Sequence, residues 1–142
     1  MFTLQLRYLS FFFALISILS FFNIIYSYYL NLYLNLNTYY YSLIFSLVIS
    51  IVFYKFKISE KKISIFDKIF TVFLGYLLLP LVLSIPFYFS IYNLTFLNAY
   101  FEAISGFTST GFSIFENIKH IDQSLILWRS STQWIGGLYF LF

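Results

Sequence analysis

Hydroxyl-bearing residues and glycine gather in one short stretch of this chain, which reads FEAISGFTSTGF from Phe101 to Phe112. An apolar run that suits a helix ends there in Thr108, Ser109, Thr110 and Gly111. Carbonyl and hydroxyl oxygens of such residues can replace the water around a cation, and a glycine can adopt backbone angles that turn carbonyls toward one axis. The stretch therefore predicts a short helix followed by a cation filter.

The same four residues, taken alone, also fit an exposed turn after a surface helix, because Ser, Thr and Gly are common loop residues. The elements around them must therefore be considered. The chain has 142 residues, of which 61% are hydrophobic, 26% aromatic and only 9% charged. This composition is typical of an integral membrane protein and lies outside the range of soluble domains. We interpret most of the aromatic rings as lipid-facing residues.

Several other classes of protein are disfavoured by the residues present. The chain has no cysteine, so it has neither disulfides nor thiolate sites. Its net charge of +3 is concentrated in one loop, which does not suit nucleic-acid binding. It contains no glycine-rich nucleotide loop and no plausible catalytic triad. We expect a protein that is not an enzyme and needs no cofactor apart from a transported ion.

Four apolar blocks can be compared with the roughly 20 residues that a membrane-spanning helix needs. They run over about 8–30, 39–54 and 69–90, and from about 124 to the last residue. The run at 96–107 is too short to cross, so we expect a re-entrant helix that is followed by the filter at 108–112. The predicted fold is an all-α integral membrane protein.

The predicted organisation has three parts. Residues 1–54 form a transmembrane helix pair, 55–68 a basic loop, and 69–142 one helix–pore-loop–helix repeat whose last helix looks truncated. We expect a kink in the first helix of that repeat, because it contains Pro80 and Pro86.

Lysines indicate the orientation of the chain, because short loops rich in Lys and Arg stay on the cytoplasmic side. The loop at 55–68 has a net charge of +3, from Lys55, Lys57, Lys61, Lys62 and Lys68 against Glu60 and Asp67. We therefore expect this loop and the N-terminus to be cytoplasmic and the filter to open to the exterior.

Two motifs resemble the Trk/Ktr/HKT superfamily of potassium transporters, and within it the TrkH type of potassium uptake protein. The first is the stretch from Phe101 to Phe112, which is similar to the pore helix and filter of the family's first repeat. The second is LWRSSTQWIGG from Leu127 to Gly137, which is similar to the beginning of that repeat's second helix. Both occur in order behind two additional N-terminal spans.

The resemblance implies potassium uptake in a bacterial inner membrane, with a filter in which Thr108, Ser109, Thr110 and Gly111 bind potassium. In that family four repeats of one polypeptide surround the pore, whereas this sequence has one. The chain would thus supply one of four filter walls. The resemblance also implies a homodimer of the full-length protein and a cytoplasmic nucleotide-binding regulatory subunit, besides membrane lipid.

The remaining polar residues and glycines allow more than one interpretation. Glu102 either adds to an outer field that gathers cations or anchors the short helix by pairing with Arg129; we favour the anchor. Arg129 could also extend to the membrane surface. We expect Gly136 and Gly137 to permit close helix packing. His120 and Asp122 are interpreted as solvated loop residues, since a metal site would need more ligands.

Two rival interpretations remain. The chain could be a non-conducting membrane fragment or an accessory subunit from a split or truncated gene. Four copies could also assemble into one pore, although a fourth span that stops at Phe142 makes such an assembly a weaker hypothesis.

Overall fold

The computed structural model describes residues 2–56, 64–116 and 120–141, which form helices and no strand. The helices are α1 (Phe2–Tyr29), α2 (Leu36–Tyr54), α3 (Ile65–Leu83), α4 (Ile85–Tyr88), α5 (Phe96–Phe107) and α6 (Gln123–Leu141). The prediction of an all-helical protein is confirmed for these residues.

Three segments of the described residues are long and apolar enough to cross a membrane: Leu6–Tyr29, Leu36–Tyr54 and Ile65–Tyr88. The last of these joins α3 and α4. The apolar block predicted from about 124 forms the helix α6, which is not among these three segments. Polar residues occupy its start and its middle, at Gln123 and Ser124 and again at Arg129, Ser130, Ser131, Thr132 and Gln133.

The third span differs from its prediction at both ends. It begins at Ile65, and not at 69, because the Asp67 side chain accepts a hydrogen bond from the backbone N–H of Ser64 and caps the helix. Pro80 lies inside α3, whereas the helix ends at Leu83, shortly before Pro86 in the first turn of α4. The interruption therefore occurs at the second proline. The predicted basic loop at 55–68 lies partly outside the described residues, at 57–63.

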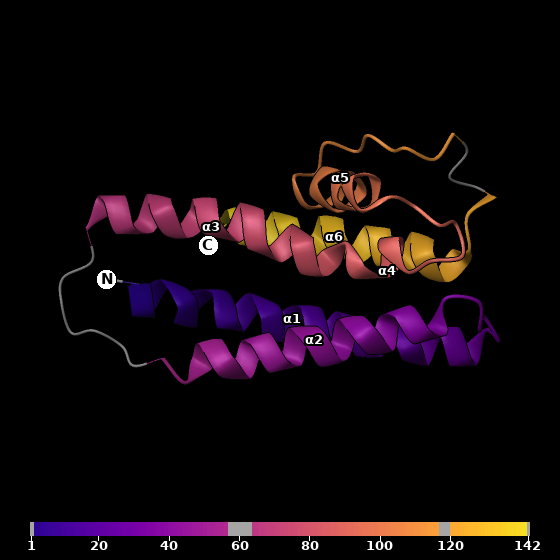
Figure 1. Ribbon diagram of the computed structural model, residues 1–142, viewed down its shortest axis with the longest axis horizontal. Coiled ribbons are helices and arrows are strands. Elements are labelled where there is room, and N and C mark those ends of the chain that lie inside the picture. Colours follow the sequence, from indigo (N-terminus) through magenta and orange to yellow (C-terminus); the bar gives the residue numbers. More distant parts are fainter. Residues whose placement is uncertain (1, 57–63, 117–119, 142) are drawn as a thin grey trace.

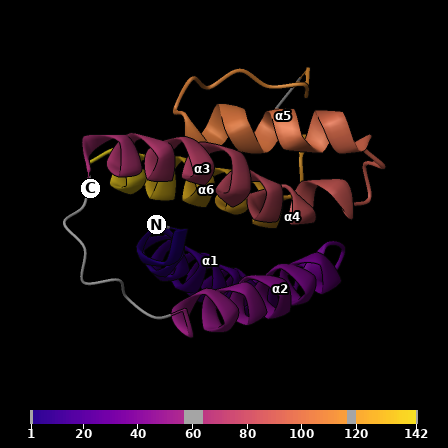
Figure 2. The same ribbon diagram turned by 60° about the vertical axis from the view of Figure 1, so that its left-hand side comes forward.

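α1 and α2 form a helical hairpin, and α3, α4, α5 and α6 form a second unit. α1 and α2 are antiparallel neighbours, and α1 also packs against α3 and α6 (Figure 1). α5 lies on the opposite side of α3 and α6 from the hairpin, as Figure 2 shows. The start of α1 and the ends of α2 and α6 lie at one end of the molecule, and α4 and the start of α6 lie at the other (Figure 1).

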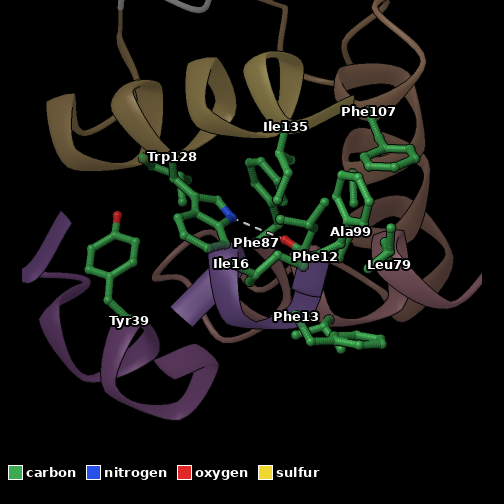
Figure 3. Close-up of a cluster of buried hydrophobic side chains, with 14 of the residues drawn as sticks. Phe12, Phe13, Ile16, Tyr39, Leu79, Phe87, Ala99, Phe107, Trp128 and Ile135 are labelled. Atoms are coloured by element: carbon green, nitrogen blue, oxygen red, sulfur yellow. Dashed lines mark hydrogen bonds between the residues drawn. The ribbon is translucent and has the colours of Figure 1, made fainter. Parts of the chain in front are cut away.

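The apolar core lies between the hairpin and the α3–α6 pair, where Phe12, Ile16, Phe87, Trp128 and Ile135 are buried (Figure 3). The Trp128 Nε1–H donates to the carbonyl of Leu83, 3.0 Å away, at the end of α3. Helix ends leave carbonyls unpaired, and these are costly in apolar surroundings, so this bond stabilises the break before α4.

Candidate ion filter and its support

α5 covers the residues 96–107 that the sequence predicts as a short helix, and it ends in a defined turn. The N–H of Ser109 donates to the Gly106 carbonyl at 2.9 Å, and that of Thr110 donates to the Ser105 carbonyl at 3.1 Å. These two bonds form a Schellman motif, with Ser109 in the left-handed region at φ 57°. The chain thereby reverses direction directly after the helix.

The four residues after α5 are exposed, and their carbonyls differ in their partners. Among the described residues, the carbonyls of Thr108, Ser109 and Thr110 accept no hydrogen bond, whereas the Gly111 carbonyl accepts one from Arg129 Nη2 at 3.1 Å. Gly111 has φ 81°, which residues with a side chain rarely adopt. Three carbonyls are therefore free of protein partners within this part of the chain, and the glycine fixes the turn that follows.

The side chain of Glu102 is fully buried and binds the segment that returns from the turn. Its Oε1 accepts hydrogen bonds from the Ser113 hydroxyl at 2.7 Å and from the backbone N–H of Ile114. Its Oε2 forms an ion pair with Arg129 Nη1. A buried carboxylate needs such partners, because burying an unpaired charge costs several kcal/mol.

Arg129 connects α6 to the same segment. Its Nη1 donates to the Ser113 hydroxyl at 2.9 Å, and its Nη2 donates to the carbonyls of Gly111 and Phe112. The side chain is nearly buried, so it does not extend to the membrane surface. Arg129 therefore forms the ion pair with Glu102 that was one of its two predicted roles. The guanidinium thus holds the backbone on the C-terminal side of the candidate filter.

Close contacts between α5 and α6 determine where the end of α5 and the candidate filter after it lie relative to α6. A Cβ on Gly136 would collide with the backbone of Phe107, and one on Gly106 would collide with the Thr132 hydroxyl. A Cβ on Gly137 would meet nothing within 4 Å. Gly136 therefore allows the end of α5 to lie directly against α6, and its neighbour has no such role among the described residues.

An aromatic cluster lies beneath the end of α5, formed by Tyr8, Phe12, Tyr76, Phe107 and Tyr139. The ring of Phe107 contacts those of Tyr76 and Tyr139 at centroid distances of 5.4 and 5.5 Å. Tyr139 also contacts Phe12 at 4.8 Å and donates to the Thr71 carbonyl at 2.9 Å. Many aromatic side chains are exposed, as expected, but these support the candidate filter from below.

A polar network joins the hairpin to the start of α6; we call it the Asp122 network. It consists of Asn35, Tyr39, Tyr92, Asp122 and Ser124. The Asp122 carboxylate accepts hydrogen bonds from Asn35 Nδ2 at 2.8 Å and from the Ser124 hydroxyl at 2.7 Å, and Ser124 also bonds Tyr39. The Asp122 N–H donates to the Tyr92 hydroxyl. Our interpretation of Asp122 as a solvated loop residue is therefore wrong.

His120 is exposed, and no group of three or more metal-binding side chains occurs among the described residues. Sequence reasoning did not identify Ser105, Ser113 or Thr132. The Ser105 hydroxyl donates to the Phe112 carbonyl, the Ser113 hydroxyl donates to Glu102, and Thr132 of α6 lies against Gly106 of α5. Serine and threonine are frequent throughout the chain, so only their contacts distinguish these three. The position of Asp122 before an apolar run is typical of a helix cap and was a usable signal.

Comparisons with known proteins agree with the two motifs. The chain is 35% identical over 65 residues to an uncharacterized cation transporter of Methanocaldococcus jannaschii, which is 46% of this chain and 14% of that protein. It is 42% identical over 60 residues to the Trk system potassium uptake protein TrkI of Halomonas elongata, and 39% identical over 46 residues to TrkG of Escherichia coli K12. These stretches are 42% and 32% of this chain.

The matched stretches cover only 11% of TrkI and 10% of TrkG, so the comparison extends to a small part of each relative. No protein-family model matches the chain, and no solved structure matches it. Several Trk potassium uptake proteins nevertheless match at 36 to 42% identity. The chain is therefore a multi-pass membrane protein with partial similarity to Trk-type potassium uptake proteins, which confirms the resemblance carried by its motifs.

Proposed function

We propose that this chain contributes one helix–pore-loop–helix repeat to a Trk-type potassium uptake protein. α3 and α6 are the two long helices of the repeat, α5 is its pore helix, and residues 108–111 form one wall of the filter. The observation that carries the proposal is the exposed turn after α5, whose first three carbonyls lack partners among the described residues. Such carbonyls can replace the hydration shell of a cation.

The surroundings of this turn favour a cation over an anion. The C-terminal end of a helix carries the negative end of its dipole, and the turn follows the C-terminus of α5 directly. The positive charge of Arg129 is paired with Glu102, so it does not oppose a cation at the turn. Thr108, Ser109 and Thr110 would face the ion through their carbonyls, and Gly111 would supply the backbone angles that complete the wall.

The orientation proposed with this function places the N-terminus in the cytoplasm and the turn toward the exterior. The lysines near the α2–α3 connection support it by the positive-inside rule. The further partners of the proposal, a second copy of the protein and a cytoplasmic nucleotide-binding subunit, rest on the resemblance alone.

Ion flux measured in liposomes tests the proposal. The protein is expressed from its native coding sequence and reconstituted, its assembly size is determined in detergent, and potassium and sodium flux are compared. We expect potassium flux that Gly111→Ala lowers about tenfold, because a side chain at φ 81° costs roughly 1–2 kcal/mol and displaces the turn. Gly137→Ala is the matched control, since its Cβ meets no neighbour within 4 Å.

Equal flux in the two glycine variants would contradict the assignment of the filter wall. A well-folded protein without any flux would contradict the conducting function and leave the alternative, a non-conducting membrane fragment or accessory subunit. Flux from an assembly of four copies would support the filter but replace the single-polypeptide arrangement.

A further inference from the structure

A pocket of about 540 Å³ lies between the first half of α1 and the end of α2. Its lining is Arg7, Ser10, Phe11, Ala14, Ser50, Ile51, Tyr54 and Lys55. The small side chains of Ser10, Ala14 and Ser50 leave the space open between the helices. The pocket lies on the far side of the molecule from the candidate filter and takes no part in the function proposed above.

The interior of this pocket is apolar apart from its two serines. The Ser50 hydroxyl donates to the Ser10 carbonyl at 2.9 Å, which joins the two helices. Phe11 and Ile51 are about half exposed, so the pocket opens on the outer side of the hairpin. In a helix that crosses a membrane, that side faces hydrocarbon chains.

Two cationic side chains line the pocket, one from each side of the hairpin. Arg7 lies in the second turn of α1, which begins at Phe2, and Lys55 directly follows the last residue of α2. The Arg7 guanidinium lies over the Tyr54 ring, 4.7 Å from its centroid, which orders it across the two helices. No carboxylate among the described residues forms an ion pair with either side chain.

Both cations therefore lie near the same end of the hairpin, beside an apolar space that is open on its outer side. In a helix pair that crosses a membrane, such an end lies near the lipid headgroups. A phosphate group complements the paired positive charges, and an acyl chain complements the lining of Phe11, Ala14 and Ile51. A soluble anion would use the charges alone and leave the apolar space without an occupant. A phospholipid with net negative charge uses both parts.

We propose that the pocket between α1 and α2 is a binding site for an anionic phospholipid, with its phosphate between Arg7 and Lys55 and one acyl chain against Phe11, Ala14 and Ile51. The bound lipid would join the ends of the two helices at the membrane surface. This inference requires only that the hairpin crosses a membrane, and it is independent of potassium transport.

The test measures the thermal unfolding midpoint of the full chain in a neutral detergent, together with lipid retention by native mass spectrometry. The probes are phosphatidylglycerol, phosphatidylcholine and inorganic phosphate. We expect phosphatidylglycerol to be retained and to raise the midpoint, and the other two probes to have little effect. Each charge removed by Arg7→Gln or Lys55→Gln should weaken phosphatidylglycerol binding about fivefold.

Three variants separate a site from general surface charge. Lys68→Gln is the matched control, because Lys68 is an exposed lysine of α3 outside the pocket lining. Arg7→Lys should retain binding, because it keeps the charge. Ala14→Trp should weaken lipid binding with both cations intact, because the larger side chain fills the apolar space. If a substitution in α1 prevents folding, Lys55→Gln still tests the site, because Lys55 is exposed and lies outside α1.

Equal binding of phosphatidylcholine would overturn the role of the two cations. An equal shift with inorganic phosphate would identify an anion site that needs no lipid and overturn the proposal. Unchanged binding in both Lys55→Gln and Ala14→Trp, or an equal loss in Lys68→Gln, would also overturn it.

Discussion

At the scale of single residues, the candidate filter depends on side chains that do not face an ion. Glu102 and Arg129 lie 27 positions apart, yet together they bind the backbone from Gly111 to Ile114. The ion pair is buried, so the attraction between the two charges must offset the cost of removing each of them from water. A pair of buried charges therefore holds the backbone that follows the candidate filter.

Reversing either charge should destabilise the protein, and reversing both should restore part of the loss. Glu102→Arg or Arg129→Glu leaves two like charges buried together, at a cost of about 3–5 kcal/mol. The double reversal restores the pair but loses the bonds from Arg129 to the two carbonyls, so rescue should be incomplete. Expression and the unfolding midpoint in detergent measure this, with Glu116→Arg, at an exposed position, as the control.

Absence of any rescue in the double variant would contradict a direct pair. A loss of the same size in Glu116→Arg would assign the effect to the net charge of the outer segment.

At the scale of helices, the depth of α5 is set by close approach to α6. Gly136 lies against the backbone of Phe107, and the ring of Phe107 rests on Tyr139, which is one turn further along α6. Backbone atoms at such a contact cannot move aside as a flexible side chain can. Gly136 therefore determines where α5 ends relative to α6, and with it the level of the turn that follows.

Gly136→Ala should displace α5, whereas Gly137→Ala should not. Overpacking a tight contact typically costs about 1–3 kcal/mol, and this one involves backbone, so we expect the upper part of that range. Accessibility of a cysteine introduced at Ser109 would report the displacement, and the unfolding midpoint would report the stability. Similar behaviour of the two variants would show that the helix contact does not set the depth of α5.

At the scale of the whole molecule, the Asp122 network joins the hairpin to the repeat. Asn35 is buried between α1 and α2 at their connecting end; it donates to Asp122 and accepts from the N–H of Ile91 at 3.1 Å. One side chain thus contacts the start of α6 and the segment after α4. The network joins the hairpin to α6 and to the segment after α4, at the end of the molecule opposite the pocket between α1 and α2.

Asn35→Leu should loosen that connection, because it leaves the Asp122 carboxylate and the Ile91 N–H each without one partner. Unsatisfied buried polar groups cost about 1–3 kcal/mol, so the unfolding midpoint should fall and hydrogen exchange at the start of α6 should rise. Asn37→Leu, two residues away and exposed, is the matched control. Exchange at α6 that does not change in Asn35→Leu would argue against a coupling role.

The sequence alone determined the helical class, the short helix at 96–107 and the resemblance to Trk-type proteins. These depend on local composition and on the length of apolar runs, which are set by the membrane thickness and by the residues themselves. The last predicted block is more polar than the other three, because the run from Arg129 to Gln133 interrupts the hydrophobic residues of α6.

Only the tertiary structure decided how the turn after α5 is held. The distinct roles of Gly136 and Gly137, the bonds from Arg129 to Gly111, and the inclusion of Asp122 in a network with Asn35 all depend on residues far apart in the chain. Identical residue types occur elsewhere without such roles, since a hydroxyl or a glycine acquires one only from the atoms placed beside it. The stretch from Thr108 to Gly111 could therefore be found by its sequence, whereas its support was visible only in the packed helices.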